Sequence, residues 1–211
     1  MSDKQYIQSL IAQGEHEQQD FKFQINDARK IARSISAFAN NTGGRLLVGV
    51  KDNGSIAGVN SEEEIYMIDQ AAQMYCKPEQ KPHFSVYYIE GKTVVKVDID
   101  EASAKPVKAP DESGPWKAYY RVADENILAS SMHVKLLRSK QQAGSGGTIT
   151  YCEREQMLLD YLNGHGGITL SGFMRLTHCS RALAEQSVVN LCQMGVVTLK
   201  YHDGQCVVTL S

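Results

Sequence analysis

One segment near the start of the chain constrains the fold more than any other. Between residues 28 and 39, apolar residues recur at steps of three and four, the spacing that places them along one side of a helix. Gly43 and Gly44 follow, and glycine accepts the left-handed backbone that commonly ends a helix. An apolar run then reaches Val50, as in a strand covered on both faces, and Asn53-Gly54 is a frequent hairpin turn. This segment predicts a buried helix, a glycine corner, a buried strand and a tight turn.

Around this segment the sequence alternates between helical and strand-like patterns. A helix is expected where apolar residues follow a helical spacing, and a strand where β-branched and aromatic residues concentrate. Three prolines between residues 104 and 115 predict an exposed loop. The expected helices cover residues 4–13, 61–78 and 130–140, and the expected strands cover residues 17–23, 84–89, 93–99 and 116–122.

A stretch of glycine, serine and glutamine at residues 141–147 has the composition of a flexible linker. We therefore expect a first domain at residues 1–140 and a second at residues 148–211. The second domain shows three helical patterns followed by two strands around the turn at residues 202–205, which is the order of a winged helix-turn-helix. The predicted fold class is α+β: a mixed α/β domain followed by a small winged helix domain.

Several separated motifs in residues 13–130 resemble the Schlafen-type AlbA-like domain, a family once described as a divergent AAA ATPase domain. The motifs are Glu15, Asp20-Phe21-Lys22, Ala37-Phe38-Ala39-Asn40, Gly43-Gly44, the stretch from Leu47 to Gly54, and Tyr119-Tyr120-Arg121. The resemblance implies a mixed α/β domain with a role in nucleic-acid binding. ATP binding is not expected, because the sequence has no Gly-x-x-x-x-Gly-Lys-Ser/Thr motif and Gly43-Gly44 ends a helix instead of starting one.

The same resemblance implies a second activity, because some Schlafen proteins are endoribonucleases with three carboxylates. The matching residues here are Glu15, Asp20 and Asp52, which would hold Mg²⁺ or Mn²⁺ against a scissile phosphate. Asp20 departs from the pattern, since the RNA-cleaving members have glutamate there, one methylene longer. The alternative is structural: Glu15 is solvated, Asp20 pairs with Lys22 or Arg45, and Asp52 serves the turn.

Basic residues are candidates for phosphate contacts, although the formal net charge is −2. A patch would combine residues near the first motif with Arg121, and the loop from Lys105 to Lys117 could add further charges. On the third helix of the second domain, three side chains can contact bases or phosphates, while Glu185 would repel phosphate. The candidates for nucleic-acid binding are Lys22, Arg29, Lys30, Arg33, Arg121, Arg181, Gln186 and Asn190. The alternative is a set of solvated surface charges.

Three functional hypotheses follow. The first is a DNA-binding transcriptional regulator of bacterial type, which needs no cofactor and would bind two half-sites as a homodimer. The second is the metal-dependent endoribonuclease, with RNA as its partner. The third is a protein-interaction module without nucleic-acid binding. The sequence favours a binding protein over an enzyme. The polar first ten residues and the absence of a long apolar run predict no signal peptide, no membrane partner and a cytoplasmic location.

Overall fold

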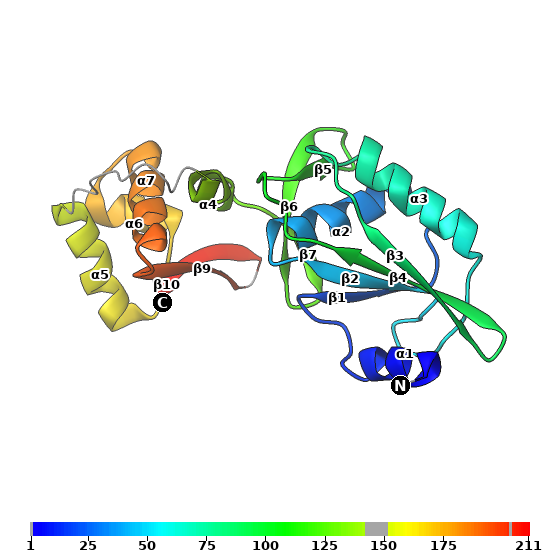
Figure 1. Cartoon of the computed structure of the whole chain (residues 1–211). Helices are drawn as coiled ribbons and strands as arrows, with labels where there is room; N and C mark the ends of the chain where they lie inside the picture. Colours follow the sequence, from blue (N-terminus) through cyan, green and yellow to red (C-terminus); the bar gives the residue numbers. More distant parts are fainter. Residues whose placement is uncertain (1, 142–151, 203) are drawn as a thin grey trace. The chain divides into compact units, whose positions relative to one another are not determined.

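The computed structural model describes residues 2–141, 152–202 and 204–211. The chain forms two compact units, the first ending at Leu128 and the second beginning at Ala129. Both units combine helices with β-strands (Figure 1), so the predicted α+β class is confirmed. Within the described ranges, no helix has the length and hydrophobicity needed to cross a lipid bilayer.

The first unit is built from two sheets and three helices. Its helices are α1 (Asp3–Ile11), α2 (Ala28–Asn40) and α3 (Ser61–Met74). One sheet has the strand order β1-β2-β4-β3, with β1 (Gln19–Lys22), β2 (Gly44–Val48), β3 (His83–Ile89) and β4 (Lys92–Ile99). The other has the order β5-β6-β7, with β5 (Lys108–Pro110), β6 (Trp116–Val122) and β7 (Glu125–Leu128). Strand β1 runs parallel to β2, and the other pairs are antiparallel.

Helix α2 is the centre of this unit. Its apolar residues pack in one cluster with side chains of β2 and β4, with Ala109 and Tyr119 of the second sheet and with Val107 just before that sheet, so α2 lies between the two sheets (Figure 1). Helix α1 covers the other face of the first sheet through a separate apolar cluster. At the end of α2, Asn40 Nδ2 donates to the carbonyl oxygens of Val107 and Tyr119, both at 2.8 Å. These bonds attach the second sheet to the helix.

The glycine corner after α2 forms as predicted, for two different reasons. Gly43 has a φ of +78°, which favours glycine. Gly44 has no such φ, but a Cβ atom there would lie 2.2 Å from Cδ1 of Phe38. Both positions therefore need glycine. The tight turn at Asn53-Gly54 also forms, and a single bridge pairs Val50 with Ile56 across it.

The sequence patterns miss two short strands of the first unit. Strand β5 lies inside the proline-rich segment for which an exposed loop is predicted, and β7 follows β6 after a two-residue turn. Both are edge strands of only a few residues. Pro110 can end β5 because an edge strand does not need every backbone N–H for pairing.

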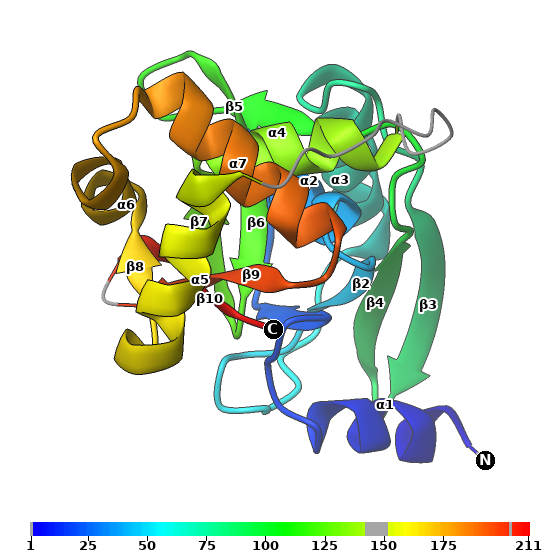
Figure 2. The same ribbon diagram turned by 90° about the vertical axis from the view of Figure 1, so that its left-hand side faces the viewer.

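The second unit packs its helices on one side of a small sheet (Figure 2). Its sheet has the order β8-β10-β9. The elements are α4 (Ser131–Gln141), α5 (Glu153–His165), β8 (Ile168–Thr169), α6 (Leu170–Thr177), α7 (Arg181–Gln193), β9 (Val197–His202) and β10 (Gln205–Leu210). Leu158, Phe173 and Val188 are fully buried in its core.

The expected domain boundary at residue 140 is wrong. Helix α4 belongs to the second unit, because Met132 is buried in the core of that unit and Lys135 pairs with Glu185 of α7 at 2.6 Å. The helical pattern of residues 130–140 indicates a helix but does not indicate the core on which it packs. The expected linker at residues 141–147 falls, after Gln141, outside the described residues.

Candidate nucleic-acid interface

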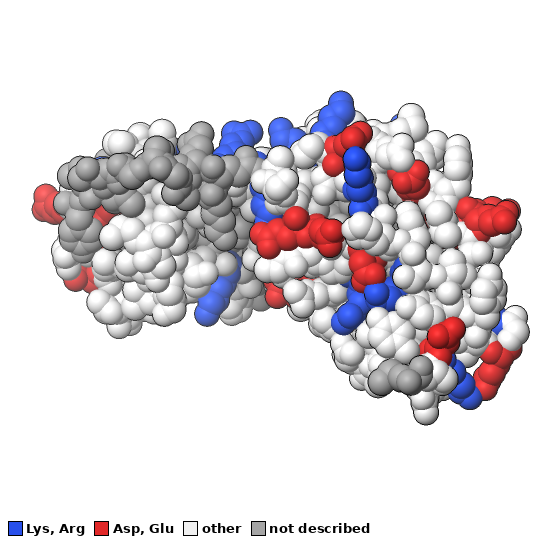
Figure 3. Space-filling model, in the orientation of Figure 1, with Lys and Arg blue, Asp and Glu red and all other residues white. Residues whose placement is uncertain are grey.

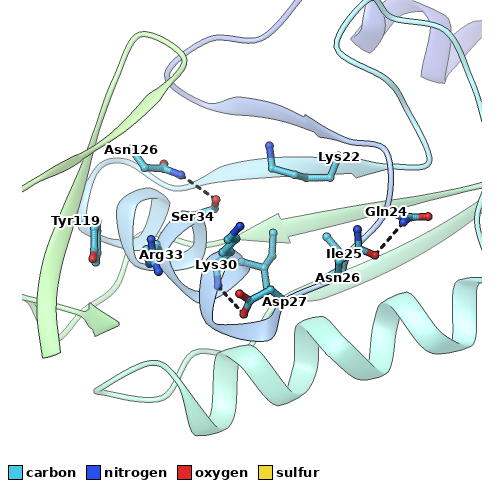
Figure 4. A pocket seen from close by; sticks show the side chains of 11 residues that line it. Lys22, Gln24, Ile25, Asn26, Asp27, Lys30, Arg33, Ser34, Tyr119 and Asn126 are labelled. Carbon is cyan, nitrogen blue, oxygen red and sulfur yellow. Dashed lines mark hydrogen bonds between the residues drawn. The ribbon is translucent and has the colours of Figure 1, made fainter. Parts of the chain in front are cut away.

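The first unit contains a pocket of about 440 Å³ beside helix α2. The end of β1, the connection to α2, one side of α2 and the strands β6 and β7 form its walls (Figure 4). The described residues that line it are Lys22, Gln24, Ile25, Asn26, Asp27, Lys30, Ile31, Arg33, Ser34, Tyr119 and Asn126. Three of the predicted phosphate-binding residues are therefore brought together in one hollow.

These three cations differ in how they are held. Lys30 is exposed, and no ion pair of its amino group is found among the described residues. Arg33 is anchored, since its Nε donates to the carbonyl of Pro110 at 3.2 Å and its Nη1 lies 3.1 Å from Glu112. Lys22 Nζ lies 2.7 Å from Asp20 and donates to the carbonyl of Phe21. Figure 4 shows Lys30 and Arg33 on the helix and Lys22 on the strand side of the pocket.

Asp27 is the one acidic residue among the described residues that line the pocket. Its carboxylate accepts hydrogen bonds from the backbone N–H groups of Arg29 and Lys30, at 2.8 and 3.3 Å, and so caps α2. Arg29, the fourth predicted cation, does not line the pocket, and its guanidinium lies 5.7 Å from the ring centre of Tyr75.

Sequence reasoning missed the neutral polar residues of the pocket. Asn126 Nδ2 donates to Ser34 Oγ at 2.9 Å, and Gln24 Nε2 donates to Asn26 Oδ1 at 2.9 Å. The hydroxyl of Tyr119 donates to Asp111, and burial and that carboxylate raise the pKa of Tyr119 to about 12. Ser34 is one of several polar residues on α2, so the sequence alone did not single it out.

Two of the three predicted metal ligands lie next to each other beside this pocket. Glu15 accepts a hydrogen bond from the backbone N–H of Phe21 at 2.8 Å, and burial and the neighbouring Asp20 raise its pKa. Asp20 is 3 % exposed and is paired with Lys22 at 2.7 Å and with Arg121 at 3.3 Å. Two cations therefore already neutralise the Asp20 carboxylate. Of the two partners that the structural alternative named, Lys22 is found, and Arg121 takes the place of Arg45.

Asp52 does not join the other two acids. It is exposed in the turn after β2, and among the described residues no group of three or more His, Cys, Asp or Glu side chains is placed to hold a metal ion. The acids present therefore do not fit the Mg²⁺ or Mn²⁺ site that the endoribonuclease hypothesis requires, since a lysine and an arginine take the place of the cation at Asp20.

Arg121 is not a surface phosphate contact, and this prediction is wrong. Its side chain is 1 % exposed, and its guanidinium binds Asp20, the carbonyl of Gln19 and Asn126. It also lies 4.9 Å from the ring centre of Phe38. Lys105, at the start of the expected basic loop, is likewise occupied, because its amino group donates to the last carbonyls of α2.

In the second unit, the three candidate contacts lie on α7. Arg181 Nε pairs with Glu185 at 2.9 Å and its Nη2 donates to Ser131, whereas Gln186 Nε2 donates to Asn190 Oδ1 at 2.7 Å on the solvent side. Repulsion of phosphate by Glu185 is predicted from the sequence. Its side chain is instead buried between α7 and α4, where Lys135 and Arg181 neutralise it.

The charge pattern of the first unit is mixed outside the pocket. On the face shown in Figure 3, lysine and arginine side chains alternate with aspartate and glutamate side chains. That face therefore does not form a continuous basic surface. The grouping of cations around the pocket is local, and it distinguishes the pocket from the mixed charges of that face.

A family model described as Schlafen, AlbA_2 matches residues 15–130, more than half of the chain. The chain belongs to the Schlafen AlbA_2 family.

Among curated proteins, none is found to match the chain. Nine chains of solved structures match it, including the following two. The DIP2311 protein from Corynebacterium diphtheriae is 23 % identical over 63 % of this chain, with a TM-score of 0.44, and the match spans 25 % of that protein. The second is the N-terminal domain of a Nitrosomonas europaea protein named as related to the ATP-dependent DNA helicase RecG. It is 19 % identical over 72 % of this chain and 94 % of that domain, with a TM-score of 0.44.

Proposed function

We propose that this protein binds nucleic acid and acts as a DNA-binding transcriptional regulator. The observation that carries the proposal is the grouping of Lys22, Lys30 and Arg33 around one pocket of the AlbA_2 domain, with Asp27 occupied in capping α2. Amino and guanidinium groups that surround a hollow attract phosphate, which supplies most of the affinity in nucleic-acid binding.

The second unit supports the regulatory part of the proposal. Its chain order from α5 to β10 is helix, short strand, helix, helix and hairpin, which is the order of a winged helix. In such a unit α7 would enter the major groove, and Gln186 and Asn190 face solvent with amide groups suited to adenine. Two half-sites would require a homodimer, and a cytoplasmic location fits this role.

Fluorescence anisotropy with a labelled 20-base-pair duplex at several salt concentrations tests the proposal. In Lys30→Glu, affinity should fall about tenfold for all sequences, and the slope of log affinity against log salt should decrease by about one. Lys81→Glu makes the same charge change at an exposed lysine outside the pocket and is the matched control. Equal affinities for both variants and the parent protein would contradict the proposal.

A second measurement addresses the winged helix. The double substitution Gln186→Ala and Asn190→Ala should reduce the preference between a selected duplex and a scrambled one by about 1–3 kcal/mol for each base that no longer receives its hydrogen bonds. Nonspecific affinity should stay unchanged, because neither residue is charged. An unchanged preference would remove α7 from the DNA interface.

The solvent side of α7 also favours a second candidate, the protein-interaction module. Leu183 and Met194 are 49 % and 53 % exposed, at positions that share one side of the helix with Gln186 and Asn190. Such a neutral, partly apolar side is more typical of a protein contact than of a phosphate contact. If the double substitution leaves the preference between the selected and the scrambled duplex unchanged, this candidate gains support.

A further inference from the structure

The cations of the pocket are arranged in a hollow instead of on a flat surface. A duplex presents its phosphates on the outside of a stiff, convex rod, so it contacts exposed basic patches and grooves most easily. Here the side chains of Lys22 and Arg33 are only partly exposed, and that of Arg33 is only 18 % exposed. A ligand must enter the hollow to reach Arg33.

We propose that the pocket receives one nucleoside monophosphate unit, either as a free nucleotide or as an unpaired residue of a nucleic-acid strand. The inference deepens the proposed nucleic-acid function by naming the substrate class of the same site, and it rests on that function for the strand form. A volume of about 440 Å³ lies within the range of small-ligand pockets, roughly 300–1,000 Å³.

The phosphate would lie among Lys22, Lys30 and Arg33. Lys22 and Arg33 each pair with an acid, but both can still bind a phosphate. Asp20 carries one negative charge that Lys22 shares with the buried Arg121. Glu112 is 77 % exposed, so its pair with Arg33 is weak and a phosphate can replace it. Lys30 adds a third donor from the exposed side of α2.

The nucleoside would contact residues 23–27, which connect β1 to α2. Because Gln24 donates its amide N–H to Asn26 Oδ1, the side-chain oxygen of Gln24 and the amino group of Asn26 remain as a neighbouring acceptor and donor. Such a pair matches the edge of an unpaired base, whose hydrogen-bonding groups a duplex would conceal. Ile25 and Ile31 add apolar surface for the base or sugar.

The test measures binding of three probes to the full chain. A fluorescein-labelled fifteen-residue oligo-dT reports the unpaired strand by anisotropy, an unlabelled fifteen-base-pair duplex is the competitor, and an amide NMR titration with AMP reports the free nucleotide. The variants are Lys30→Ala and Gln24→Ala, both exposed and therefore compatible with folding, with Lys81→Ala as the matched control. Removal of a charge-assisted hydrogen bond in Lys30→Ala should weaken oligo-dT binding about tenfold.

We expect oligo-dT to bind more tightly than the duplex, AMP to shift the amide signals of Ser34 and Asn126, and only the pocket variants to bind more weakly. Binding of AMP with no binding of either strand would retain the pocket inference and reject the proposed nucleic-acid function. Equal binding of duplex and oligo-dT, weakened alike by Lys30→Ala but unaffected by Gln24→Ala and without AMP shifts, would overturn the inference and leave the proposed function standing. Strand binding that neither pocket variant changes would overturn both. Failure of all three probes would overturn both.

Discussion

Each unit of this protein buries one carboxylate next to the residues proposed to contact nucleic acid, but the two carboxylates are neutralised differently. In the first unit, Asp20 pairs with Arg121, and the two side chains are 5 % and 1 % exposed. In the second unit, Glu185 is buried, while its partners Lys135 and Arg181 have side chains that are 41 % and 67 % exposed. One pair is buried at both ends and the other at one end only.

This difference shows how a buried acid changes the role of the cations around it. Arg121 belongs to the core, so its charge stabilises the fold and is withheld from a ligand. Because Arg121 shares the charge of Asp20, Lys22 can face the pocket. In the second unit no equivalent core cation is found among the described partners of Glu185, so Arg181, the basic residue at the start of α7, is held by the protein itself.

The largest effect should come from breaking the pair that is buried at both ends. Arg121→Met would leave Asp20 buried with a single partner and should lower the free energy of unfolding of the first unit by about 3–5 kcal/mol. Urea unfolding followed by tryptophan fluorescence measures this unit, because Trp116 in β6 is the one tryptophan of the chain. A decrease smaller than about 1 kcal/mol would mean that the buried pair contributes no more than a surface pair.

The next largest effect should come from low pH, which should destabilise the second unit before the first. In the second unit, burial lowers the pKa of His133 to about 4. Burial would raise the pKa of Glu185, but hydrogen bonds from Lys135, Ser131 and Arg181 outweigh it and lower the pKa to about 2. Glu155 behaves in the same way, since burial is outweighed by hydrogen bonds from Cys152 and Ser187 and the pKa falls to about 2.

For all three groups the unfolded chain binds protons more readily than the folded chain. Their stabilisation is complete above the ordinary pKa and is lost as the pH falls, from 6.5 to about 4 for His133 and from 4.5 to about 2 for the two glutamates. Glu15 of the first unit has the opposite sign, because its raised pKa favours the folded state at lower pH. The pKa of Asp111 in the first unit is also lowered, but Asp111 lies at the surface, where solvent screens its charge and weakens its effect on stability.

The second unit should therefore unfold first on acidification. Amide NMR spectra recorded from pH 7 to pH 3 should lose the signals of α5 to α7 before the indole signal of Trp116. Replacing His133 by Asn removes the earliest of these protonation steps, so the onset should move to lower pH. Disappearance of both sets of signals at one pH would contradict the distinction between the units.

Glu185→Gln should have a moderate effect. It removes the buried charge, but Lys135 and Arg181 are exposed enough to be solvated again, so the second unit should be destabilised by about 1–2 kcal/mol. Hydrogen exchange of the amides of α7 measures this local stability. Because Arg181 is released, binding to duplex DNA should rise slightly if α7 contacts phosphate, and this increase would be absent if α7 contacts protein.

The smallest effect should come from Arg181→Ala. Its pair with Glu185 is a largely exposed contact between residues one helical turn apart, and such pairs contribute about 0.3–0.5 kcal/mol. Lys135 continues to neutralise Glu185. A destabilisation above about 2 kcal/mol, measured by the same hydrogen exchange, would show that Arg181 is as integral to its unit as Arg121.

The sequence predicted the elements of the fold well where the signal was local. The helix at α2, the glycine corner and the strand β2 follow from periodicity and from the conformational freedom of glycine. Of the cations predicted to contact phosphate, Lys22, Lys30 and Arg33 lie around one pocket, and their contact with nucleic acid stays a prediction, whereas Arg121 is buried. A strand residue faces one side of the sheet or the other, and the sequence of β6 did not reveal which neighbour would meet Arg121.

By itself, the sequence determined the family, the α+β class and most of the helices and strands, because backbone propensity and apolar spacing act between neighbouring residues. Only the tertiary structure decided which charges face solvent. It paired Asp20 with Arg121, which lie far apart in the chain, and it did not bring Asp52 into a metal-binding group with Glu15 and Asp20 in the part of the chain that it describes. It also attached α4 to the second core. Burial of a charge depends on every element packed around it, and no local pattern contains that information.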